Sequence, residues 1–97
     1  MSAVATTIQL PEQLDFPAAS ALRAELLAVR GTAVEVNGSA VNRLGALCLQ
    51  VLLSAAGTWR ADGQDFRIVD PSGALQDGFQ LLGATMPSDQ LEGVSGA

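Results

Sequence analysis

The sequence lacks histidine, tyrosine and lysine, and it contains one cysteine among its 97 residues. Without histidine, Ser-His-Asp triads and imidazole-ligated metal sites are excluded. We also find no Walker loop, no GxGxxG fingerprint, no paired carboxylates and no nucleophile–base pair. We therefore expect a protein that is not an enzyme and that binds no cofactor and no metal ion.

Long apolar runs and disulfide-forming cysteines are also missing. Cys48 has no second cysteine to pair with, which favours a reducing compartment. The first ten residues do not have the basic and apolar regions of a signal peptide. The most apolar stretch, Leu44 to Ala56, is shorter than the roughly 20 residues that cross a bilayer. These features predict a cytoplasmic protein with no direct membrane insertion.

Positive charge is scarce as well. Ten acidic residues face five arginines, so the formal net charge is -5. This balance opposes binding to nucleic acid or to anionic lipid, whose phosphates would be repelled, and it suits a basic partner. In contrast, 48% of the residues are hydrophobic, which is enough to bury the core of one domain.

The apolar pattern predicts strands that alternate with helices. Three β-prone segments are predicted strands: 6–10, 32–37 and 65–69. The segment 40–44 is either a further strand or a loop. Three segments are predicted helices: about 17–29, 46–61 and 72–82, the last with Ser72 as its N-cap. This alternation predicts an α/β domain with a mixed sheet of four or five strands, flanked by helices mainly on one face.

Two stretches, VEVNGSAVNRLGALCLQVLLSAA and TWRADGQDFRIVDPSGALQDGFQLLGA, together with this order of elements, resemble the STAS family. The family takes its name from sulfate transporters and anti-sigma-factor antagonists. The resemblance runs from about Ile8 to Gly83. It implies a single STAS-like domain over residues 1–86. The segment 87–97 is rich in Ser, Gly and acidic residues and is predicted to be a loosely ordered tail.

In the family, the loop before the second helix usually reads Asp-Ser-x-Gly-Leu, with Thr as an alternative to Ser. A partner kinase phosphorylates the hydroxyl, and the added charge breaks the complex with the partner. Aligned with this sequence, Gly45 stands at the acid, Ala46 at the phospho-acceptor and Cys48 at the glycine, and only Leu49 matches. Because alanine has no hydroxyl, the resemblance implies a copy without the phosphorylation switch.

Two further positions bear on that loss. Asn37 stands where the family often has an acid at the end of the preceding strand. No Ser or Thr lies between Val41 and Leu53, so Ser39 is the alternative acceptor, although a turn serine usually only bonds backbone. The domain either binds its partner constitutively or is controlled by something else.

Helical phase suggests where a partner docks. One face of the second helix is predicted to be core: Leu49, Leu52, Leu53 and Ala56. Leu47 and Val51 then point away from the sheet, in line with Ser54 and Thr58. An apolar pair beside the motif loop indicates a partner surface, with scattered surface aliphatics as the alternative. The predicted partner-binding residues are Asn37, Ser39, Arg43, Gly45, Ala46, Leu47, Gln50 and Val51.

Other residues have structural interpretations. Cys48 is read as a small buried residue rather than a reactive thiol, and Trp59 as a packing residue. Arg43 either contacts an acidic partner or is solvated. Four acids are read as solvated turn and cap residues: Asp62, Asp65, Asp70 and Asp77.

The resemblance implies a non-catalytic protein-interaction module of bacterial signalling. Its partner would be an anti-sigma factor kinase or a chemotaxis signalling protein. The alternative is a STAS subunit that stabilises the ATPase of a lipid-transport ABC complex, and a nucleotide or lipid binder is a further alternative. The partner's identity would separate them.

Overall fold

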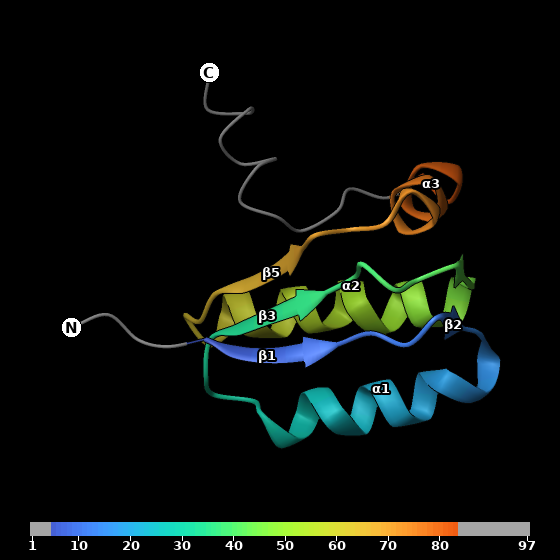
Figure 1. Ribbon diagram of the computed structural model, residues 1–97. Helices are drawn as coiled ribbons and strands as arrows, with labels where there is room; N and C mark the ends of the chain where they lie inside the picture. Colours follow the sequence, from blue (N-terminus) through green and yellow to red (C-terminus); the bar gives the residue numbers. More distant parts are fainter. Residues whose placement is uncertain (1–4, 84–97) are drawn as a thin grey trace.

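The computed structural model describes residues 5–83, which form five strands and three helices (Figure 1). The strands are β1 (Thr6–Gln9), β2 (Gln13–Leu14), β3 (Val34–Asn37), β4 (Arg43–Leu44) and β5 (Phe66–Val69). The helices are α1 (Phe16–Ala28), α2 (Ala46–Ala61) and α3 (Gly73–Leu81). Each helix begins and ends within one residue of its predicted bounds. The predicted tail, 87–97, lies outside the described residues.

The strands form two small parallel sheets, where the sequence predicts one mixed sheet. The first has the order β1-β3-β5, and the second pairs β2 with β4. Every strand pair between residues 5 and 83 is parallel, because α1 and α2 each cross over between neighbouring strands. Pro11, which has no N–H to donate, separates β1 from β2, and the turn at Gly38 separates β3 from β4. The α/β class is confirmed, and the mixed sheet is corrected for this part of the chain.

The central strand β3 alternates between buried and half-buried side chains, as a strand covered on one face does. Val34 and Val36 are fully buried, and their partners across the register include Ile8 and Ile68. On the other face, Glu35 forms an ion pair with Arg67 of β5. The sheet therefore has one apolar face and one polar face.

The helices α1 and α2 run side by side over the apolar face, and α3 lies beyond the end of β5 (Figure 1). This arrangement confirms the prediction that helices flank mainly one face. The buried side chains of all three helices and of the strands form one core. Each aliphatic side chain buried there contributes about 1.5–3 kcal/mol.

The helix ends follow the predicted signals in part. Ser72 is the N-cap of α3, and its Oγ accepts a hydrogen bond of 3.0 Å from the Leu75 N–H. Asp15 is the N-cap of α1, but its side chain makes no capping bond. Gly31 and Gly63, the predicted stops of α1 and α2, have φ angles of +95° and +72°, which glycine adopts without strain.

Candidate functional site

The predicted partner-binding residues run from the end of β3 to the second turn of α2, and a network of polar side chains fixes the turn after β3. The Asn37 Oδ1 accepts hydrogen bonds from the Ser39 N–H at 2.9 Å and from the Ser39 hydroxyl at 2.7 Å. It also accepts a bond of 3.4 Å from Gln9, and the Asn37 amide donates to Asp70 at 3.5 Å. Asn37 thus links the carboxyl ends of three neighbouring strands, and the Ser39 hydroxyl is engaged by a side chain.

Gly38 places this turn underneath α3. Its N–H donates to the Val69 carbonyl at 3.0 Å, and its carbonyl accepts from the Ser72 N–H at 3.0 Å. A Cβ atom at position 38 would collide with the buried Leu75 side chain. The Ser72 hydroxyl also donates to the Val41 carbonyl at 2.6 Å. The loop and the start of α3 are therefore held as one unit.

The start of α2 is anchored through its backbone and not through a capping side chain. The Gly45 N–H donates to the Leu14 carbonyl at 2.8 Å, and Gly45 is the N-cap without a side-chain bond. A Cβ atom there would lie 3.2 Å from the Leu14 oxygen, so a larger residue would require a small shift. Ala46, at the phospho-acceptor position, is exposed. The first turn of α2 therefore presents two apolar residues, Ala46 and Leu47, to solvent.

Cys48 packs below this turn and is completely buried. Its thiol donates to the Asp15 carbonyl at 3.2 Å, which ties the first turn of α2 to the start of α1. Burial raises the pKa of the thiol, and the nearby Asp15 charge raises it further. The thiol therefore stays protonated, and the interpretation of Cys48 as a small buried residue is confirmed.

The predicted phase of α2 is partly wrong. Leu49 and Leu52 are buried as expected, but Leu53 is 36% exposed. Ala56 is also only half-buried, and the inward face is completed by Cys48, Ala55 and Trp59. The reason is that α2 packs against both the sheet and α1, so its buried arc is rotated toward α1.

The same rotation affects Leu47 and Val51, the apolar pair predicted to be exposed and to contact a partner. Leu47 is 42% exposed, as expected, whereas Val51 is half-buried and packs against the core. Trp59 has the predicted packing role: it is buried, its Nε1–H donates to the Thr32 carbonyl at 2.7 Å, and its ring meets Phe66 edge-on at 5.7 Å. The recurrence of Cys48, Leu52, Ala55 and Trp59 at helical spacing is the signal that would have given the right phase.

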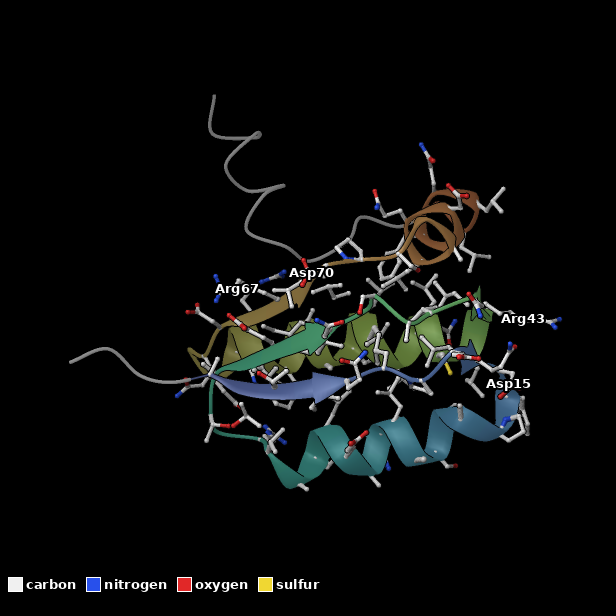
Figure 2. The ribbon with its side chains drawn as sticks, viewed as in Figure 1. Asp15, Arg43, Arg67 and Asp70 are labelled. Atoms are coloured by element: carbon white, nitrogen blue, oxygen red, sulfur yellow. The ribbon has the colours of Figure 1, made fainter. Side chains whose placement is uncertain are left out.

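The predicted partner-binding residues separate into two groups. Asn37 and Ser39 are used within the turn after β3. The others lie at the end of the molecule where α1 and α2 begin, and there Arg43 points into solvent near Asp15 (Figure 2). Figure 2 shows Arg67 on β5 and Asp70 where β5 ends, and both lie apart from Arg43 and Asp15. Within residues 5–83, Arg43 has no ion-pair partner.

The four acids predicted to be solvated do not form a cluster. Asp62 forms an ion pair with Arg30 at 3.0 Å, and this hydrogen bond lowers the pKa of the Asp62 carboxyl. Over residues 5–83, no group of three His, Cys, Asp or Glu residues could hold a metal ion. None of the three helices described is long and apolar enough to cross a membrane.

Comparison with known proteins agrees with this fold. A family model described as "Mlab, STAS domain" matches residues 1–86. No curated protein and no solved structure matches the chain. The match covers nearly the whole chain, and the observed order of strands and helices fits it. The chain therefore belongs to the STAS domain family, whose members suggest a protein-interaction or regulatory role.

Proposed function

We propose that this domain is a non-catalytic protein-interaction module of cytoplasmic bacterial signalling, which docks its partner through the start of α2. The partner would be an anti-sigma factor kinase or a chemotaxis signalling protein. The docking surface would comprise the predicted residues from Arg43 to Val51, with Ala46 and Leu47 at its centre. Binding would be constitutive, because Ala46 cannot be phosphorylated.

One observation carries the proposal: an exposed apolar surface on a rigid support. Ala46 and Leu47 face solvent at the first turn of α2. The backbone bond from Gly45 to Leu14 and the thiol bond from Cys48 to Asp15 hold that turn in place. Aliphatic side chains on a preorganised surface contribute to association with little loss of conformational entropy. Burial of the exposed Leu47 side chain in a complex would thus contribute a favourable transfer free energy that the isolated domain lacks.

A second candidate function is favoured by the description of the matched family. That description names an Mlab STAS domain and not an anti-sigma-factor antagonist. In this candidate, the domain is a stable subunit that supports the ATPase of a lipid-transport ABC complex. The same surface at the start of α2 would then contact the ATPase permanently.

Affinity capture with matched variants tests the proposal. We expect the tagged domain to retain one stoichiometric signalling protein, Ala46→Glu to lose it, and Ala24→Glu to keep it. Ala24 is exposed on α1 and provides a matched change of charge away from the surface. Mass spectrometry identifies the protein, and an ABC ATPase would select the second candidate. A partner that Ala46→Glu retains would overturn the proposed docking region.

A further inference from the structure

A groove runs between α1 and α2 on the side facing away from the sheet, with a volume of about 490 Å³. Its lining includes Arg23 and Leu27 from α1, Arg30 just after α1, and Leu47 and Ser54 from α2. The lining residues of α2 run from Leu47 to Trp59, which corresponds to roughly 18 Å along the helix axis, or just over three turns. The groove therefore begins at the proposed docking surface and extends beyond it.

Apolar side chains on both helices remain open to solvent along this groove. Leu27 is 47% exposed and Leu47 is 42% exposed. Phe16, which is more exposed still, lies at the same helical phase of α1 as Arg23 and Leu27. Leucines that are half open to water bury further apolar area only when another surface covers them.

The charge of the groove is opposite to that of the chain. Two of the five arginines line it, and no acidic side chain does, although the chain carries a net charge of -5. Arg30 already forms an ion pair with Asp62 at 3.0 Å. Among residues 5–83, Arg23 has neither an ion pair nor a side-chain hydrogen bond, so its guanidinium is free to bind a carboxylate.

The shape of the groove favours a helix as its occupant. Both walls are helices whose backbone groups are bonded internally, so an extended peptide finds no strand edge to join. A helix needs only side-chain contacts, and its ridges fit between two helices. A small ligand is disfavoured, because such ligands are usually buried over most of their surface and this groove is open.

We propose that the groove between α1 and α2 receives an acidic amphipathic α-helix of a partner protein. Apolar residues of that helix pack on Leu27 and Leu47, and a carboxylate pairs with Arg23. This inference rests on the proposed protein-docking function and specifies the chemistry of the partner.

A pair of synthetic helical peptides tests the inference. Each has about 15 residues, or four turns, with a leucine stripe flanked by glutamate in one peptide and by lysine in the other. Trp59 lines the groove but is 1% exposed, so binding is followed through the fluorescence anisotropy of peptides labelled at one end. The net charge of -5 would by itself favour the lysine peptide. Preference for the glutamate peptide would therefore come from the groove.

We expect saturable binding of the glutamate peptide, about tenfold tighter than that of the lysine peptide. Arg23→Glu should weaken this binding by about tenfold or more, whereas Arg60→Glu should not, because Arg60 is exposed on α2 outside the groove. Thermal unfolding checks that both variants are folded. Equal or tighter binding of the lysine peptide, no saturation, or indifference to Arg23→Glu would overturn the inference.

Other occupants give different results. Binding to vesicles of anionic phospholipid that Arg23→Glu abolishes would identify a lipid surface instead. Self-association in sedimentation velocity that Leu27→Asp abolishes would identify a second copy of the chain, and either result overturns the inference. If a natural partner is lost with Ala46→Glu but kept with Arg23→Glu, the proposed function stands and the groove inference fails. If the peptide result holds but no partner depends on Ala46, the reverse is true.

Discussion

The turn after β3 and the start of α2 lie within ten residues of each other, yet their side chains are used in opposite ways. In the turn, Asn37 and Ser39 bond to each other and to neighbouring strands. At the start of α2, Ala46 and Leu47 make no polar contact and face solvent. The polar segment serves the fold and the apolar segment is left open, so polarity alone is a poor guide to a docking surface.

The largest expected effect tests the orientation of α2, on which the open surface depends. Leu52→Ala should lower the free energy of unfolding by about 2–5 kcal/mol, because Leu52 is completely buried. Leu53→Ala, on the adjacent position, should cost well under half as much, since Leu53 is 36% exposed. Urea denaturation measures both variants. Equal losses would mean that α2 is rotated away from the orientation described.

A glycine substitution tests how tightly the turn is packed. Gly38→Ala should destabilise the domain by about 1–3 kcal/mol, because the added methyl group meets the end of the Leu75 side chain, which is completely buried and would have to shift within the packed core. Gly57→Ala is the matched control in α2, where a Cβ atom meets nothing. The control should stabilise the helix by about 0.5–1 kcal/mol. Loss of stability in both variants would point to a general intolerance of alanine.

Removing the Ser39 hydroxyl tests whether this serine serves the fold. Ser39→Ala removes the 2.7 Å bond to Asn37 and should cost about 0.5–1.5 kcal/mol. Ala46→Ser adds a hydroxyl at an exposed position and should leave the stability nearly unchanged. Thermal unfolding of the two variants side by side measures the contrast. If Ser39→Ala leaves the stability unchanged, the hydroxyl does not serve the fold.

The smallest expected effect is electrostatic and concerns the ion pair beside the groove. The pKa of Asp62 is lowered by its hydrogen bond to Arg30, so the pair stabilises the fold above the ordinary aspartate pKa of about 3.9. That contribution is lost as the pH falls through the lowered value. In an NMR titration, Arg30→Gln should raise the pKa of Asp62 toward its ordinary range. An unchanged pKa would mean that the pair does not persist in solution.

Much of the fold follows from local sequence signals. The three helices, the Ser72 cap, and the burial of Cys48 and Trp59 could all be predicted, because periodicity and capping act within a few residues. The two-residue strand β2 and the division into two sheets could not, because they depend on pairing between distant segments. The phase of α2 was partly missed for a similar reason: contact with α1 rotates its buried arc.

The position of the candidate site in the chain could be predicted, but the contacts of its side chains could not. The alignment placed Ala46 at the start of α2, where the structure has it exposed. The hydrogen bonds of Asn37 to Gln9 and Asp70 join three strand ends, and no local pattern contains them. The groove between α1 and α2 depends on how the two helices pack, so its basic lining was also not predicted.

The affinity of the captured partner for Leu47→Asp, measured together with the melting temperature of that variant, tests the central claim most directly. Leu47 is 42% exposed at the start of α2, so a charge there should leave the melting temperature nearly unchanged. The same charge should weaken partner binding strongly, because it must be desolvated in the complex. Unfolding as severe as that of Leu52→Asp, or unaltered affinity for the partner, would contradict the claim that the start of α2 is the docking surface.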